Sequence, residues 1–159
     1  MTTVAVISDT HLPRGARRLP ELCLERLCRA DLILHAGDLT SVSVLEELQA
    51  LGPPVEAVLG NVDEPALQEL LPEERIVDVA GIRIAMRHVP DREERLLARF
   101  PGCGAVVFGH THVPLVEERE GVWLLNPGSP TERRRSQFHS MLVLEVEAGE
   151  IRPELIRVS

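Results

Sequence analysis

Two histidines, His110 and His112, stand two residues apart in the stretch F-G-H-T-H-V-P, directly behind an apolar run at residues 105–108. Side chains two positions apart point to the same side of an extended backbone, so both imidazole rings can face one point. Imidazole is the commonest protein ligand for transition metals. Two surface histidines in a loop would fit these seven residues equally well, so the rest of the sequence has to distinguish the two interpretations.

Carboxylate, amide and imidazole side chains also follow four other apolar runs. They are Asp9 and His11 behind residues 4–8, Asp38 behind residues 32–35, Asn61 behind residues 55–59, and His88 behind residues 82–86. A helix cap or a turn would explain a single Asp or Asn, but histidine is not a capping residue. Ligands of open α/β sheets gather at the carboxyl ends of parallel strands, so we expect these side chains to meet.

The donor set of two Asp, one Asn and four His indicates a site for more than one metal ion. Seven groups exceed what one tetrahedral ion uses. If one carboxylate bridges, they can serve two ions of octahedral type and leave room for water. Mixed nitrogen and oxygen donors favour Mn, Fe, Co, Ni or Zn over Ca or Mg. A cation would also offset the cost of burying ionised carboxylates.

The elements that position these residues alternate between strand and helix patterns. Strands are predicted at residues 4–8, 32–35, 55–59 and 105–108, and helices at residues 18–29, 42–51, 66–71 and 93–100. This alternation predicts parallel strands joined by right-handed crossovers. Three hairpins are predicted around Ala80-Gly81, Glu120-Gly121 and Ala148-Gly149. They pair residues 75–79 with 82–86, 115–119 with 122–125, and 141–146 with 151–158. The expected fold is two packed sheets with helices outside, in one domain spanning residues 1–159.

Composition excludes several classes of protein. The chain has 159 residues, 44% of them hydrophobic, and no apolar run approaches the roughly 20 residues that span a bilayer. The N-terminus reads as a first strand rather than a signal segment. The three cysteines are odd in number and form no C-x-x-C pair, so we expect no disulfides and a reducing cytoplasm. A net charge of −8 argues against extended nucleic acid as a partner, but not against a small phosphorylated substrate.

The ordered set D-x-H, G-D, G-N, H and G-H-x-H, followed by Asn126-Pro127-Gly128-Ser129, resembles the calcineurin-like metallophosphoesterase superfamily. It is most similar to the compact bacterial and archaeal phosphodiesterase branch, which shares its fold with a eukaryotic retromer subunit. The resemblance implies an α/β fold, a four-layer α-β-β-α sandwich of two mixed sheets. It also implies two divalent metal ions, with Mn²⁺ expected and Ni²⁺, Co²⁺, Fe²⁺ or Zn²⁺ as alternatives. One ion would be held by Asp9, His11, Asp38 and His112, and the other by Asp38, Asn61, His88 and His110.

The same resemblance implies a hydrolase in which Asp38 bridges the ions and Asp38, Asn61 and His110 take part in catalysis. A metal-activated hydroxide would attack phosphorus in line with the leaving oxygen of a small phosphodiester. A catalytically silent protein-interaction scaffold and a phosphomonoesterase or nucleotidase remain alternatives. The presence of all seven ligand side chains favours an enzyme. No membrane partner is expected, and homo-oligomerisation stays open.

Two positions depart from the family pattern. Many phosphatases of the superfamily have G-N-H-[DE], whose histidine helps to protonate the leaving group, whereas this chain has Gly60-Asn61-Val62-Asp63. Valine cannot transfer a proton, so we expect a preference for activated leaving groups. Asp63 either orients neighbouring groups or caps a turn. The branch usually has T-H-G-H where this chain has Arg87-His88-Val89-Pro90, so the loop path and substrate pocket are expected to differ.

Three further features are assigned less specific roles. His35 is expected to be a buried supporting residue rather than a ligand, and His139 is expected to be non-ligating. The basic run Arg133-Arg134-Arg135 follows the N-P-G-S stretch. It is either a solvated turn or a source of one arginine that reaches a substrate phosphate.

Overall fold

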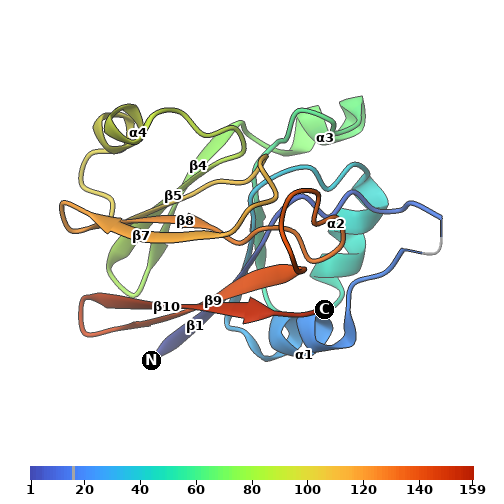
Figure 1. The fold of residues 1–159 in the computed structure, drawn as a ribbon, viewed down its shortest axis with the longest axis horizontal. Coiled ribbons are helices and arrows are strands. Elements are labelled where there is room, and N and C mark those ends of the chain that lie inside the picture. Colours follow the sequence, from blue (N-terminus) through green and yellow to red (C-terminus); the bar gives the residue numbers. More distant parts are fainter. Residues whose placement is uncertain (16) are drawn as a thin grey trace.

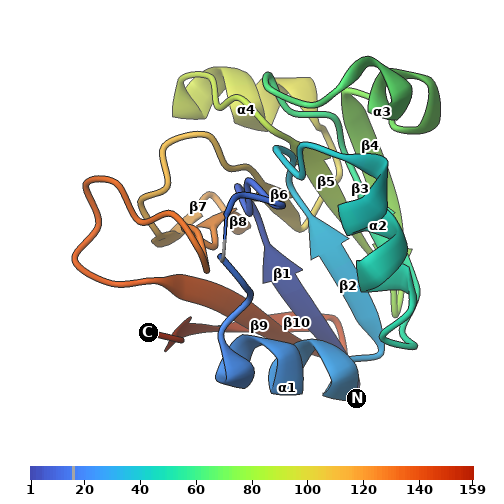
Figure 2. The ribbon, with the colours of Figure 1, turned by 90° about the vertical axis from the view of Figure 1, so that its right-hand side faces the viewer.

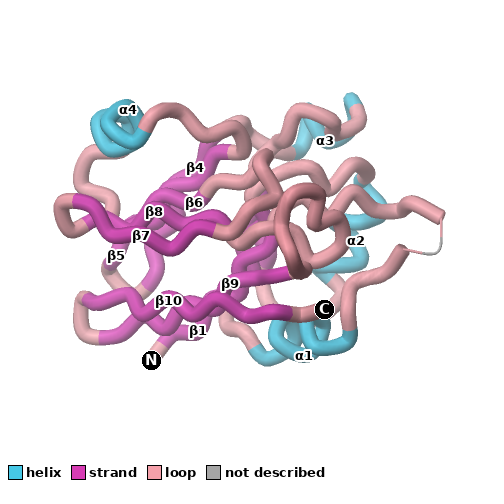
Figure 3. The backbone as a smooth tube through the Cα atoms, in the orientation of Figure 1, coloured by secondary structure: helices cyan, strands magenta, loops and turns pink. Residues whose placement is uncertain are grey.

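The fold alternates strands and helices in its first part and ends in antiparallel hairpins (Figures 1 and 3). It is seen in a computed structural model that describes residues 1–15 and 17–159. The first elements are β1 (Thr2–Ile7), α1 (Glu21–Arg29), β2 (Leu32–His35), α2 (Val42–Gln49), β3 (Val55–Ala57) and α3 (Pro65–Leu70). They are followed by β4 (Glu74–Val79), β5 (Ile82–Arg87), α4 (Glu93–Arg99), β6 (Ala105–Val107), β7 (Leu115–Arg119), β8 (Val122–Asn126), β9 (Ser140–Glu147) and β10 (Glu150–Arg157).

Two mixed sheets of five strands each form the centre of the molecule. The first has the order β10-β9-β1-β2-β3, with β1, β2 and β3 parallel and the β9–β10 hairpin antiparallel beside β1. The second has the order β4-β5-β6-β8-β7, with β5, β6 and β8 parallel and the outer strands antiparallel. The predicted parallel units and all three predicted hairpins are therefore confirmed.

The layers follow from which side chains each strand buries. Along β1, Val4 and Val6 enter the core between the two sheets, while Ala5 and Ile7 pack against α1 and α2 on the outer face. Leu96 of α4 packs on the outer face of the second sheet. The result is the predicted α-β-β-α sandwich, and Figure 2 shows α1 and α2 beside β1 and β2. In residues 1–15 and 17–159, no helix is both long and apolar enough to cross a membrane.

The prediction was wrong mainly at element ends. The helix predicted for residues 18–29 begins at Glu21, because Pro20 has an extended backbone and stands just before the first turn. The strand predicted for residues 55–59 ends at Ala57. The hairpin turns were better specified: Ala80 and Gly81 both have positive φ, of 48° and 84°. Two consecutive residues of that kind define the tight turn that matches the strand twist.

Candidate metal centre

The predicted site residues come together at one end of the two sheets. Asp9 and His11 follow β1 and Asp38 follows β2, and the arrows of these two strands point the same way in Figure 2. His88 follows β5, and His110 and His112 follow β6, so the second sheet supplies the other histidines. Five of the seven residues have a positive φ between 47° and 73°: Asp9, His11, Asp38, His110 and His112. Non-glycine residues rarely adopt this conformation, and they do so most often at functional sites.

Two buried carboxylates face the imidazole nitrogens. The Oδ1 atom of Asp9 lies 3.3 Å from His112 Nε2, 3.6 Å from His88 Nε2 and 3.8 Å from His11 Nε2. The Oδ2 atom of Asp38 lies 3.0 Å from His88 Nε2 and 3.6 Å from His11 Nε2. Two donors that each lie ~2.1 Å from one ion are roughly 3.0–3.5 Å apart. The separations within this cluster are therefore close to those of ligands that share an ion.

Hydrogen bonds outside the cluster set the orientation of its donors. The His88 Nδ1–H donates to the Ala36 carbonyl over 2.7 Å, and the His112 Nδ1–H donates to the Glu132 carbonyl. Carbonyl oxygens only accept, so Nδ1 carries a proton in both rings and Nε2 is the nitrogen left to face the cluster. The other oxygen of Asp9, Oδ2, accepts from the Ser8 hydroxyl and the His110 backbone N–H, which leaves Oδ1 for the cluster. Bonds of this kind fix ring orientation at metal sites.

The atoms that converge here lack hydrogen-bond partners among the described residues. These atoms are Asp9 Oδ1 and the Nε2 atoms of His11, His88 and His112, and all four are buried. Leaving four buried polar atoms unsatisfied is costly, and a divalent cation between them would satisfy all four. The residues present therefore fit a metal ion. They form two tight groups, Asp9 with His11 and His112, and Asp9 with Asp38 and His88.

Asn61 and His110 lie on the outer side of this cluster. The His110 Nδ1 atom is 3.3 Å from Asn61 Oδ1, and the His110 ring is 5.5 Å from the His88 ring, edge to face. Asn61 is exposed and His110 is half-buried. All seven predicted residues are thus in one region. The tight groups share Asp9, whereas the expected sets share Asp38, so the bridging role of Asp38 stays a prediction.

Burial and charge act in opposite directions on the pKa values of the cluster. Burial would raise the pKa of Asp9, but contacts with His11 and His112 and the charge of His88 hold that pKa well below its ordinary value. Burial likewise opposes ionisation of Asp38, yet His88 lowers the pKa of Asp38. The pKa of His88 is raised because the two aspartates outweigh its burial. The cluster therefore attracts a cation, and a proton competes with a metal for the same nitrogens.

Asp63 connects two of the loops through hydrogen bonds. Its carboxylate accepts the Gly60 N–H over 2.7 Å, the Thr40 N–H over 2.7 Å and the Asp38 N–H over 3.2 Å. Because the bonds come from the loops after β2 and β3, they fix Asp38 relative to Asn61. This favours the orienting role for Asp63 over a simple turn cap.

The loops approach so closely that glycine is required at two positions. A Cβ atom on Gly60 would lie 2.1 Å from Asp38 Oδ1 and 2.2 Å from Asp38 N. A Cβ atom on Gly109 would lie 2.1 Å from Ser8 Oγ and 2.6 Å from Asp9 Oδ2. Only a residue without a Cβ atom fits at these two positions unless the neighbouring loops move apart.

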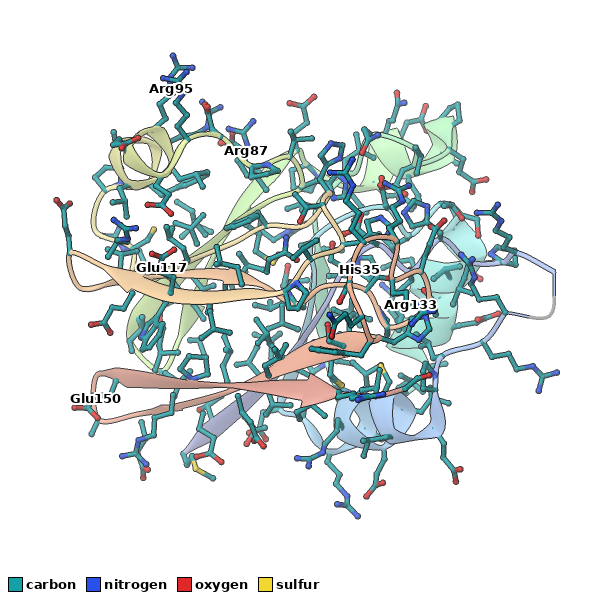
Figure 4. All side chains as sticks on the ribbon, viewed as in Figure 1. His35, Arg87, Arg95, Glu117, Arg133 and Glu150 are labelled. Carbon is teal, nitrogen blue, oxygen red and sulfur yellow. The ribbon has the colours of Figure 1, made fainter. Side chains whose placement is uncertain are left out.

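His35 supports the site from the interior, where Figure 4 labels it. Its Nδ1 atom accepts the Gly37 N–H over 3.1 Å, so its Nε2–H donates to the Thr10 hydroxyl, also over 3.1 Å. With both nitrogens engaged, His35 has no lone pair for a metal, as predicted. Burial lowers its pKa to about 3, so the ring is neutral at neutral pH.

Glu132 is a site residue that the strand-end pattern did not reveal. Its Oε2 atom is buried and lies 3.6 Å from His11 Nε2, and the same carboxylate contacts Arg14 and Arg17 at 3.3 and 3.7 Å. The only signal in the sequence was its position three residues after the N-P-G-S stretch. Ser129 of that stretch donates to the Asp9 carbonyl over 2.8 Å, so this loop is attached to the loop after β1.

A layered sandwich with buried Asp and His at its strand ends fits the class of metal-binding phosphoesterases. Comparison with known proteins identifies the family: residues 2–149 match the calcineurin-like phosphoesterase superfamily domain, and the chain belongs to this superfamily. A probable metallophosphoesterase of Methanothermobacter thermautotrophicus is 38% identical over 97% of this chain and 91% of that protein. A phosphodiesterase of Methanocaldococcus jannaschii is 29% identical over 79% of this chain and 82% of that protein. Vps29 of Chaetomium thermophilum shares the fold, with a TM-score of 0.81 over 99% of this chain and 97% of that chain, at 20% identity.

Proposed function

We propose that this protein is a metal-dependent phosphodiesterase that hydrolyses a small phosphodiester. The observation that carries the proposal is the set of buried, unpartnered atoms, Asp9 Oδ1 and the Nε2 atoms of His11, His88 and His112. They converge at the carboxyl ends of parallel strands, within the residues that match the phosphoesterase family. The similarity to an archaeal protein named as a phosphodiesterase supports the same reaction class.

The residues would divide between two divalent ions, for which Mn²⁺ is the first candidate. One ion would be held by Asp9, His11, Asp38 and His112, and the other by Asp38, Asn61, His88 and His110. Asp38 fits the shared position because its Oδ2 atom faces His11 and His88, which belong to different sets. When bound, such ions lower the pKa of water and neutralise charge on phosphoryl oxygens.

The chain's own groups then orient the substrate and limit its chemistry. The amide of Asn61 is uncharged and exposed, so its N–H₂ can donate to a phosphoryl oxygen while its oxygen faces a metal. Asp63 holds the loop of Asn61 against that of Asp38. Val62 occupies the position next to Asn61, is 48% exposed and has no proton to give. The leaving group must therefore depart without a proton from position 62, which favours diesters with leaving groups of low pKa.

Two other functions are weaker candidates. A catalytically silent scaffold is suggested by the shared fold with Vps29, but a scaffold gains nothing from five buried donors gathered in one cluster. A phosphomonoesterase would benefit most from an acid at position 62, where this chain has valine.

Hydrolysis of bis-p-nitrophenyl phosphate beside p-nitrophenyl phosphate tests the proposal. The protein would be stripped with a chelator and then supplied with Mn²⁺, Ni²⁺, Co²⁺, Zn²⁺ or Mg²⁺ in turn. We expect metal-restored activity that is higher on the diester than on the monoester. Faster cleavage of the monoester would indicate a phosphomonoesterase. A folded protein that is inactive with every metal would favour the scaffold.

A further inference from the structure

A cleft opens beside the candidate metal centre and shares His110 with it. It has a volume of about 720 Å³, and its lining includes His110, Val113, Pro114, Arg134 and Arg135. The two arginines come from the loop between β8 and β9, on which Figure 4 labels their neighbour Arg133. The cleft therefore combines an apolar wall, two guanidinium groups and one residue of the proposed catalytic site.

The two arginines are presented by a turn and are not neutralised. The Ser136 N–H donates to the Arg133 carbonyl over 2.9 Å, which places Arg134 and Arg135 at the two central positions. Both side chains are exposed, and neither takes part in any salt bridge within the described ranges, residues 1–15 and 17–159. Two free guanidinium groups together are notable in a chain with 25 acidic residues and a net charge of −8. They concentrate positive charge in one loop of an otherwise acidic molecule, and guanidinium groups are suited to phosphate oxygens.

The cleft also has an apolar wall, which a bare anion would not use. Val113 is 42% exposed in the cleft, directly after His112. Val62 and Val89 are also exposed, at 48% and 41%, and directly follow Asn61 and His88. Of these three valines, Val113 lines the cleft, beside Pro114, which favours an organic group that packs there.

We propose that the cleft binds the part of the substrate beyond the scissile phosphate, and that this part is a nucleoside-like organic group carrying a second phosphate. The organic group would pack on Val113 and Pro114, and the second phosphate would accept hydrogen bonds from Arg134 and Arg135. The inference rests on the proposed function, because that function places the scissile phosphate at the metal centre. Two arginines match one added phosphate, whereas the acidic surface disfavours a long nucleic acid.

A matched pair of chromogenic diesters tests this inference. They are thymidine 5′-(p-nitrophenyl phosphate) and the same compound with a 3′-phosphate. In both, water adds to phosphorus, the bond to the aryl oxygen breaks and p-nitrophenolate leaves, so only the second phosphate differs. We expect the 3′-phosphate to raise kcat/KM by about tenfold or more, mainly through a lower KM.

Two variants decide whether the cleft is responsible. The double variant Arg134→Gln/Arg135→Gln should lose the gain from the 3′-phosphate while keeping its rate on bis-p-nitrophenyl phosphate. The matched control is Arg133→Gln, because Arg133 donates to the Gln137 carbonyl and does not line the cleft. This control should keep the gain. Calorimetry with thymidine 3′,5′-bisphosphate and thymidine 5′-phosphate gives a readout that does not depend on turnover.

The outcomes separate this inference from the proposed function. Equal kcat/KM for the two thymidine esters, with bis-p-nitrophenyl phosphate still cleaved, would overturn the cleft assignment and leave the phosphodiesterase intact. A gain from the 3′-phosphate that persists in the double variant would also overturn the cleft assignment and leave the phosphodiesterase intact. Absence of all cleavage would remove the proposed function. In that case, equal binding of the bisphosphate and the monophosphate would overturn the cleft assignment as well.

Discussion

At the scale of single residues, Asp38 tests the proposed division of ligands between two ions. Its Oδ2 atom faces His11 and His88, and its Oδ1 atom accepts the Val62 N–H over 3.0 Å. We expect Asp38→Asn to lower metal content below two ions per chain and to reduce diester hydrolysis by at least about 100-fold, because the shared negative charge is lost. Metal analysis after gel filtration and steady-state kinetics measure both effects.

The control for this change is Asp78→Asn. Asp78 accepts the Gly81 N–H within the β4–β5 hairpin, remote from the site, so its variant should keep both metals and full activity. Full diester activity in Asp38→Asn would show that the division of ligands proposed here is wrong.

Val62 offers a second test, in which a function is added rather than removed. Val62→His places an imidazole where the chain has no proton donor, next to Asn61. We expect turnover of phenyl phosphate, which has a poor leaving group, to rise by about tenfold, with little change for p-nitrophenyl phosphate. The comparison variant is Val62→Gln, which is polar but not an acid. If the two variants behave alike, position 62 does not face the leaving group.

The site residues could be predicted where their residue type is unusual at the end of a strand. His88, His110 and His112 were found because histidine neither caps helices nor favours turns. Glu132 was not found, since a glutamate in a charged loop is usually solvated and its contacts with His11 and Arg14 depend on tertiary structure. The sharing of Asp9 between both tight groups also depends on the loop path, which residue types do not specify.

At the scale of elements, the loops after the strands determine the site. The Gly60→Ala change tests this, because the added Cβ would lie 2.2 Å from the backbone nitrogen of Asp38, which cannot move aside as a side chain can. We expect metal affinity to fall by more than about tenfold and stability to fall by about 2–4 kcal/mol. Isothermal titration with Mn²⁺ and urea unfolding measure the two quantities.

Gly149→Ala is the matched control. Gly149 has a φ of 77° in the β9–β10 turn and no atom near an added Cβ, so alanine there strains only the backbone. Its variant should lose about 1 kcal/mol of stability and bind metal normally. Normal metal binding by Gly60→Ala would show that the contact between the two loops is dispensable.

The elements themselves could be predicted more fully than their ends. The alternation in β1 and the Ala-Gly and Glu-Gly turns specify strands and hairpins locally, which is why the three hairpins were correct. The predicted start of α1 was wrong. Leu19 fits the apolar spacing of the helix, but Pro20 has an extended backbone and the helix begins only after it. The order of strands within each sheet depends on contacts between distant residues, which periodicity does not contain.

At the scale of the whole molecule, the site joins the two sheets. Asp9, His11 and Asp38 come from loops of the first sheet, while His88 and His112 come from loops of the second. The buried apolar core between the sheets therefore sets the distances between carboxylates and imidazoles. Any change that alters the packing of one sheet on the other is expected to change metal affinity even when every donor is retained.

The stability of the folded protein depends on pH through His35. Burial holds its pKa at about 3 in the folded protein, whereas an unfolded histidine has a pKa near 6.5. Between pH 3 and pH 6.5, His35 binds a proton in the unfolded chain but not in the folded chain. The contribution of His35 to stability is therefore complete above about pH 6.5 and is lost progressively toward pH 3. From pH 7.5 to pH 5.0, we expect this group to lower the free energy of unfolding by about 2 kcal/mol.

Urea unfolding of chelated protein at several pH values measures this loss. His35→Gln keeps a polar side chain but cannot titrate, so stability of this variant should fall less steeply between pH 7.5 and pH 5.0. His139→Gln is the comparison variant, because His139 is only half-buried and lies outside the candidate site. Burial and the charges of Arg133 and Arg17 also lower the pKa of His139, so its variant should flatten the slope too, but less than His35→Gln. Identical slopes for the wild-type protein and His35→Gln would mean that other groups cause the acid sensitivity. A greater flattening in His35→Gln than in His139→Gln would show that protonation of the ring between Thr10 and Gly37 destabilises the fold beside the candidate metal centre.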